Sequence, residues 1–161
     1  MSSLTHFDET GRARMVNVGG KHDTQRVAVA EGEILMKPET IQLIKSGEIA
    51  KGDVLAVAQV AGIMAAKETN RLIPMCHPLL LEGVKMSFEI EEVNNRVIAR
   101  AEISLTGKTG VEMEAMTGVS IALLTIYDMC KAVDKEMTIT GIKLTKKTGG
   151  KSGTFIRGGD K

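Results

Sequence analysis

The segments VKMSFEIEE (84–92) and RVIARAEISL (96–105) decide the fold. Apolar and polar side chains alternate along both, which is typical of strands with one buried face. Asn94-Asn95 lies between them, and asparagine tolerates the positive φ that tight hairpin turns require. We therefore predict a β-hairpin near the middle of the chain.

The flanking sequence predicts the other elements. Residues 26–36 and 138–145 have the composition of strands, and residues 39–46, 54–72 and 111–133 have that of helices, with Asp53 as an N-cap. The order strand, helix, strand, strand, helix, strand predicts a ferredoxin-like α+β sandwich, βαββαβ, with helices on one face of an antiparallel sheet. A doubly wound α/β sheet is the alternative, which the central hairpin disfavours.

The composition is that of one globular domain. The chain has 161 residues, 43% apolar and 25% charged, which excludes wholesale disorder. We predict a single domain over 1–161 with a mobile N-terminal arm (about 1–25) and a basic, Gly-rich C-terminal tail (about 146–161). Residues 135–161 contain seven Lys and Arg against two acidic residues, which indicates a local anion site or, alternatively, a solvated terminus.

The sequence also predicts a cytoplasmic location without membrane insertion. The N-terminus lacks the apolar stretch of a signal peptide, and the 13 residues 54–66 are too few to span a bilayer. Cys76 and Cys130 form no CxxC pair, which is typical of reduced thiols. The three Phe, one Tyr and absence of Trp disfavour a base-stacking surface for nucleic acid.

Several Gly-Lys pairs fail the P-loop pattern. A P-loop has a second glycine five residues before its Gly-Lys pair. Gly107-Lys108-Thr109 has Glu102 at that position and Gly150-Lys151-Ser152 has Thr145, so neither fits. A Walker-type nucleotidase is therefore excluded. The Gly-rich segments GGKH (19–22) and KKTGGKSG (146–153) can still bring backbone N–H groups and lysines to a phosphate.

Two prolines enclose a Cys-His pair in LIPMCHPL (72–79). Such a loop is semi-rigid and presents the imidazole of His77 in a fixed place, or it is simply a packed loop. A metal site would need further ligands, and only His6 and His22 remain as histidines.

Asp128 and Lys131 lie three residues apart in the predicted long helix and can meet on one face. Glu114 lies fourteen residues earlier, about 21 Å along a helix axis at 1.5 Å per residue. The pair is either a surface ion pair or, because its neighbours are apolar, a partly buried pair suited to proton transfer.

Three segments, LIPMCHPL (72–79), LTGKTGVEMEAMTGVSIALLTIYDMCKAVDK (105–135) and KTGGKSG (147–153), closely resemble the MoaC family, the cyclic pyranopterin monophosphate synthases of molybdenum cofactor biosynthesis. The resemblance extends to KGDV (51–54) and to VNVGGK in the arm. It implies a ferredoxin-like lyase that converts 3′,8-cyclo-7,8-dihydroguanosine 5′-triphosphate to the cyclic pyranopterin and releases pyrophosphate. It also implies a hexamer of three dimers, with the active site at the dimer interface.

The resemblance assigns roles to residues. It implies that Asp128 is the catalytic acid/base with Lys131 as its partner and Lys51 as the third catalytic residue. It also implies that Met75, Cys76, His77, Met113 and Glu114 line the substrate site. Glu112 or Glu114 suits the N–H donors of a guanine-like edge. A triphosphate needs clustered cations, which Lys21, Arg26, Lys51, Lys147 and Lys151 can supply. No cofactor is required and no protein metal site is expected, although Mg²⁺ can accompany the triphosphate.

Two other functions stay open at the level of the sequence. A non-catalytic anion sensor could use the same fold, although it has no reason to carry Asp128, Lys131 and Lys51 together. Nucleic-acid binding is disfavoured by the balanced charge and the few aromatic residues.

Overall fold

A five-stranded antiparallel sheet forms one layer of the molecule in the computed structural model, which describes residues 7–158. The strands are β1 (Thr24–Leu35), β2 (Gly83–Glu91), β3 (Arg96–Gly107), β4 (Thr138–Thr148) and β5 (Phe155–Ile156). Their order across the sheet is β2-β3-β1-β4-β5. The predicted hairpin joins β2 to β3, and Asn95 in its turn has a φ of 50°.

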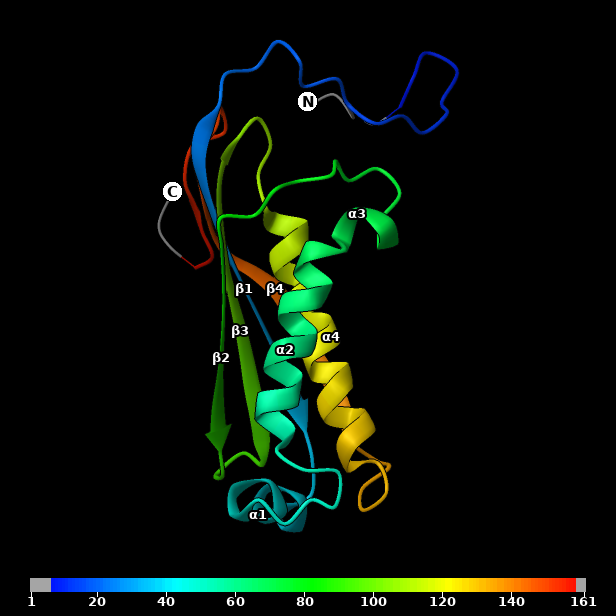
Figure 1. Ribbon diagram of the computed structural model, residues 1–161, viewed down its shortest axis with the longest axis vertical. Helices are drawn as coiled ribbons and strands as arrows, with labels where there is room; N and C mark the ends of the chain where they lie inside the picture. Colours follow the sequence, from blue (N-terminus) through cyan, green and yellow to red (C-terminus); the bar gives the residue numbers. More distant parts are fainter. Residues whose placement is uncertain (1–6, 159–161) are drawn as a thin grey trace.

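Helices form the second layer, on one face of the sheet (Figure 1). They are α1 (Pro38–Ser46), α2 (Val54–Lys67), α3 (Thr69–Leu72) and α4 (Glu112–Cys130), with α2 and α4 covering the sheet. The predicted βαββαβ arrangement is confirmed, the short helix predicted over 39–46 is α1, and β5 is an addition. The pairings between the described strands are all antiparallel, so the doubly wound alternative was wrong.

Several predicted boundaries differ from the structure. The helix predicted over 54–72 is interrupted at Glu68, which leaves the helical backbone with φ −103° and separates α2 from α3. The predicted tail begins inside β4, and its β5 pairs with Lys146 and Lys147. The last residues of the predicted arm belong to β1. Residues 1–6 and 159–161, the ends of the predicted arm and tail, lie outside the described residues.

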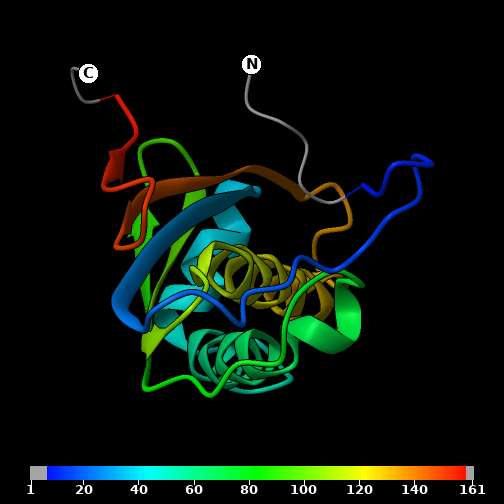
Figure 2. The same ribbon diagram turned by 90° about the horizontal axis from the view of Figure 1, so that it is seen from above.

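Helix α4 is the centre of the core, between the sheet and α2 (Figure 2). Small residues permit this close packing, because a Cβ at Gly32 of β1 would lie 2.9 Å from Leu123 Cδ1 of α4. A Cβ at Gly62 of α2 would likewise lie 3.0 Å from the carbonyl oxygen of Gly118. Within residues 7–158, α4 is long and apolar enough to cross a membrane, but half of it is buried in the fold. It therefore packs as the core helix of this fold.

One face of α2 remains at the surface and is apolar. Val57, Val60 and Met64 are 45%, 58% and 61% exposed. Only the inner face of α2 is covered within one chain, by α4 and β2. Leu124 of α4 is also exposed.

Asp134 fastens α1 to the loop that follows α4. Its carboxylate is 2% exposed and accepts hydrogen bonds from the backbone N–H of Lys37 (2.9 Å), the hydroxyl of Thr40 (3.1 Å) and the N–H of Glu136 (3.1 Å). Burial, the largest single influence, raises the pKa of Asp134, but these hydrogen bonds together outweigh it and leave the pKa below its ordinary value. The ionised carboxylate thus stabilises the fold.

Replacing Asp134 by Ala should lower the free energy of unfolding by about 3 kcal/mol at pH 7, because buried donors lose their acceptor. Asp53→Ala removes one exposed N-cap hydrogen bond, from the N–H of Ala56, and should lower the free energy of unfolding by about 1 kcal/mol.

Because the pKa of Asp134 is depressed in the folded state, its contribution to stability is present at neutral pH and is lost as the pH falls below about 3.8 toward the folded value. Urea unfolding at pH 7 and pH 3 measures this, and an equal deficit of Asp134→Ala at both pH values would contradict it.

Candidate active site

A cavity of about 950 Å³ opens at the end of the fold where α4 begins. Its volume is within the range of small-molecule sites. Its walls come from the arm, β1, the loop after α3, the turn before α4, the first turn of α4 and the segment after β4. The ten residues predicted for substrate binding all line it: Lys21, Arg26, Met75, Cys76, His77, Glu112, Met113, Glu114, Lys147 and Lys151.

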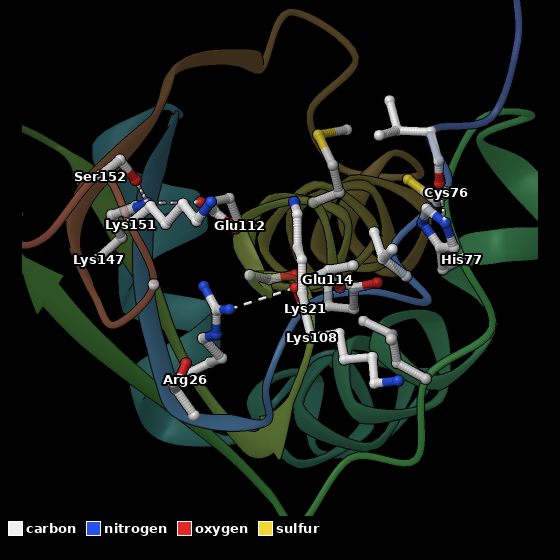
Figure 3. Close-up of a pocket in the computed structure, with 18 of the residues that line it drawn as sticks. Lys21, Arg26, Cys76, His77, Lys108, Glu112, Glu114, Lys147, Lys151 and Ser152 are labelled. Carbon is white, nitrogen blue, oxygen red and sulfur yellow. Dashed lines mark hydrogen bonds and ion pairs between the residues drawn. The ribbon is translucent and has the colours of Figure 1, made fainter. Parts of the chain in front are cut away.

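The cations enter the cavity from β1, the arm and the end of β4. Figure 3 shows Lys147, Lys151 and Ser152 on one side and Cys76 and His77 on the opposite side. The ammonium of Lys147 lies 3.6 Å from Oε1 of Glu112 and donates to the hydroxyl of Ser152. The lysines and the Cys76-His77 pair therefore lie on opposite sides of one cavity, with Glu112 next to the lysines.

Arg26 lies in the wall of the cavity and is only 8% exposed. Its Nε donates to the carbonyl of Gly107 (3.2 Å) and one terminal nitrogen donates to the carbonyl of Lys108 (3.2 Å). Gly150 packs so closely on the guanidinium that a Cβ there would lie 1.9 Å from it. Glycine with φ +76° is thus required at this position, and Arg26 joins the turn before α4 to the segment after β4.

The first turn of α4 places two carboxylates in the cavity. Glu112 is partly exposed, whereas Glu114 is 4% exposed. Burial, with a smaller contribution from the charge of Glu112, raises the pKa of Glu114 to about 7. Burial and the Glu114 charge also raise the pKa of Cys76, so its thiol stays protonated and does not act as a thiolate nucleophile at neutral pH.

His77 contacts the arm. Its Nε2 lies 2.8 Å from the carbonyl oxygen of Val16. A carbonyl oxygen only accepts hydrogen bonds, so Nε2 carries the proton, and Nδ1 is the acceptor when the ring is neutral. This contact joins the Pro-enclosed loop to the arm.

The three predicted catalytic residues lie away from this cavity. Asp128 accepts from Lys131 at 2.6 Å and from Lys51 at 3.1 Å, and Lys51 also donates to the backbone carbonyl of Asp128 at 2.8 Å. Lys131, and then Lys51, lower the pKa of Asp128, so its carboxylate is ionised at neutral pH. The side chains of Asp128 and Lys131 are 55% and 51% exposed, so the expected partial burial does not occur within one protomer.

The whole length of α4 separates the two groups. Glu112 and Glu114 lie in its first turn and Asp128 in its last, at the end of the molecule where α1 lies (Figure 1). Fourteen residues of helix between Glu114 and Asp128 correspond to about 21 Å. One protomer therefore does not bring the predicted acid/base to the predicted substrate cavity.

Sequence reasoning missed several residues of the cavity, among them His22, Lys108 and Ser152. Lys108 and Ser152 belong to the segments Gly107-Lys108-Thr109 and Gly150-Lys151-Ser152, which do not fit the P-loop pattern. The Gly-Lys-Ser/Thr sequence itself was the signal that could have identified both residues as part of the cavity. Within residues 7–158, no three His, Cys, Asp or Glu side chains are placed to hold a metal ion.

Glu114→Gln should raise the melting temperature at pH 8 but not at pH 5. The folded-state pKa of Glu114 is above its ordinary value, so its contribution to stability is present below about pH 4.5 and is lost as the pH rises through about 7. Glutamine removes the cost of the buried charge. Thermal melts of both proteins at the two pH values measure this, with Glu48→Gln as the exposed control, and an equal shift at pH 5 and pH 8 would contradict it.

Comparison with known proteins identifies the family. The MoaC family profile matches residues 15–150. The chain is 64% identical to the cyclic pyranopterin monophosphate synthase of Desulfitobacterium hafniense (96% of this chain, 94% of the relative). It is 59% identical to that of Heliobacterium modesticaldum (98% and 99%) and 61% identical to that of Brevibacillus brevis (96% of each). The predictions of family and of enzymatic function are thus confirmed: the chain belongs to the MoaC family, the cyclic pyranopterin monophosphate synthases of molybdenum cofactor biosynthesis.

Proposed function

We propose that the protein converts 3′,8-cyclo-7,8-dihydroguanosine 5′-triphosphate to cyclic pyranopterin monophosphate and pyrophosphate at a site shared by two protomers. One protomer contributes the cavity, and its partner contributes the group of Asp128, Lys131 and Lys51. The observation that carries the proposal is that the two groups lie at opposite ends of α4. Each group is chemically suited to the reaction, but neither is sufficient alone.

The phosphates bind on the basic side of the cavity. Lys147 and Lys151 reach it from the end of β4 and the segment that follows, and Lys21 reaches it from the arm. Closure of the cyclic phosphate requires a substrate hydroxyl to attack the α-phosphorus while the bond to the β-phosphate breaks. Pyrophosphate leaves with the electron pair, and the ammonium groups of Lys147 and Lys151 stabilise the negative charge that develops, while Lys21 contributes to binding of the triphosphate.

The base binds between α4 and the Pro-enclosed loop. Glu112 can accept from the N–H donors of a guanine-like edge, and His77 and Met75 form the opposite wall. Glu114, with a pKa near 7, can donate or accept a hydrogen bond at neutral pH. Only four residues of the chain are aromatic, so hydrogen bonds and sulfur contacts replace aromatic stacking here.

The Asp128 group supplies proton transfer. Opening and reclosing the imidazole ring requires protons to be accepted and returned. Asp128 is ionised and can accept a proton, while Lys131 and Lys51, both within 3.1 Å of its carboxylate, can donate one. At 55% exposure the Asp128 side chain is accessible to a neighbouring protomer.

The exposed apolar face of α2 supports such an assembly. Val57, Val60 and Met64 form this face along the middle of the molecule, and Leu124 adds an exposed apolar side chain on α4. Pairing two such faces about a twofold axis perpendicular to α2 would align the helices antiparallel. The Asp128 end of one α4 would then lie beside the Glu112 end of the other. A hexamer of three such dimers, as the family resemblance implies, remains a prediction.

We also propose a cytoplasmic location. Cys130 is buried, Cys76 lies in the cavity wall, and both are free thiols, which suits a reducing compartment. Mg²⁺ can accompany the triphosphate, and the reaction needs no further cofactor.

Complementation between inactive variants tests the shared site. Asp128→Ala and Lys147→Met should each abolish pyrophosphate release from the cyclo-nucleotide, whereas Lys45→Ala, which removes only the exposed pair with Glu92, should not. Co-expression of the two inactive chains should restore about a quarter of the wild-type activity, because half of randomly formed dimers are mixed and each has one intact site of two.

Two results would count against the proposal. Activity in Asp128→Ala alone would remove Asp128 from the chemistry. No recovery in mixed oligomers, shown to form by two differently tagged chains, would exclude a site shared in this way.

A further inference from the structure

The arm forms part of the cavity wall, and few hydrogen bonds join it to the rest of the fold. Val16, Val18, Lys21 and His22 line the cavity. In the described part of the chain, two side-chain hydrogen bonds from other segments hold residues 15–23. His77 Nε2 bonds to the carbonyl of Val16 at 2.8 Å, and Lys108 Nζ donates to the carbonyl of Gly19 at 3.1 Å. The arm's internal turn, Lys21 N–H to Val18 O at 3.0 Å, lies next to the second contact.

Lys108 reaches the arm from a fixed base. It lies in the turn between β3 and α4, and Arg26 donates to the backbone carbonyls of Gly107 and Lys108 (Figure 3). Arg26 is itself 8% exposed and packed against Gly150. The backbone of Lys108 is therefore held by the buried framework, while its ammonium extends to a segment without such support.

We propose that Lys108 is a positioning residue that holds the arm across the cavity through the carbonyl of Gly19, and so sets the position of Lys21. The sequence places Lys21 two residues after Gly19, so release of this carbonyl frees the part of the arm that carries the Lys21 ammonium. This inference rests on the proposed binding of the triphosphate in the cavity. The contact gives the Gly107-Lys108-Thr109 segment a role that the P-loop pattern did not describe.

Because the His77 contact holds a different residue of the arm, loss of the Lys108 contact has a local effect. Val16 stays bound to His77 when Lys108 is changed, whereas Val18 precedes the released carbonyl by one residue. Loss of the Lys108 contact should therefore free Val18 and Lys21 more than Val16.

Methyl-labelled protein reports the arm directly, even in a large oligomer. In the substrate-free full chain with ¹³C-labelled Val methyl groups, Lys108→Met should move the Val18 resonances toward random-coil positions and the Val16 resonances less. Val97 and Val119, which are fully buried, should not move. Lys108→Arg, which keeps a donor, and Lys85→Met, an exposed lysine on β2, should both retain the wild-type spectrum.

Kinetics test the consequence for the site. Lys108→Met and Lys21→Met should each raise KM for the cyclo-nucleotide about tenfold with little change in kcat. If Lys108 acts by placing Lys21, the double variant should remain near tenfold, whereas independent contacts would multiply to about a hundredfold.

Three results would overturn the inference. Wild-type Val18 resonances in Lys108→Met would show that Lys108 does not hold the arm, whatever happens to KM. A hundredfold KM in the double variant would make Lys108 a direct substrate contact. Unchanged KM in Lys21→Met would show that Lys21 does not bind the phosphates, which contradicts this part of the proposed function. The substrate-free spectra would still show separately whether Lys108 holds the arm.

Discussion

The close packing of α4 between the sheet and α2 is the constraint on which the rest of the structure depends. Gly32 of β1, Gly62 of α2 and Gly118 of α4 let these elements approach so closely that a Cβ at any of the three positions would crowd its neighbours. The nineteen residues of α4 therefore form one continuous helix with a fixed distance between its ends. Its two polar ends, Glu112 with Glu114 and Asp128 with Lys131, are therefore kept apart by the core itself. The separation on which the proposed shared site rests thus follows directly from the packing of the core.

Local patterns in the sequence were sufficient to predict most of the elements, although not β5. Alternation of apolar and polar side chains and the Asn94-Asn95 pair predicted the hairpin, and the apolar pattern after residue 111 predicted α4, because both signals act over a few residues. The exposed face of α2 could not be predicted, because burial on every side and burial against a partner give the same apolar sequence. The break at Glu68 also had no local signal, since Glu, Thr and Asn are all compatible with a helix.

The site was predicted unevenly for a similar reason. Charged residues beside glycines and the Pro-enclosed histidine carry a local signal, whereas Met75, Cys76, Met113 and Glu114 were implied by the family resemblance. The structure brings the ten predicted binding residues together. Lys108 acts on a backbone carbonyl 89 residues away in the chain, and any residue can supply such an acceptor. Sequence patterns do not encode contacts of that kind. The separation of Asp128 from the cavity was implicit in the helix length, which gave about 21 Å before any coordinates were considered.

In the proposed shared site, the cavity comes from one protomer and Asp128 from another. A structure of the assembled enzyme with the cyclo-nucleotide bound tests this proposal most directly. The result predicted is a ligand whose phosphates contact Lys147 and Lys151 of one chain while Asp128, Lys51 or Lys131 of a second chain lies within hydrogen-bond distance of the ligand. A ligand seated in the cavity with every Asp128 carboxylate more than about 10 Å away, beyond direct or single-water proton transfer, would contradict it.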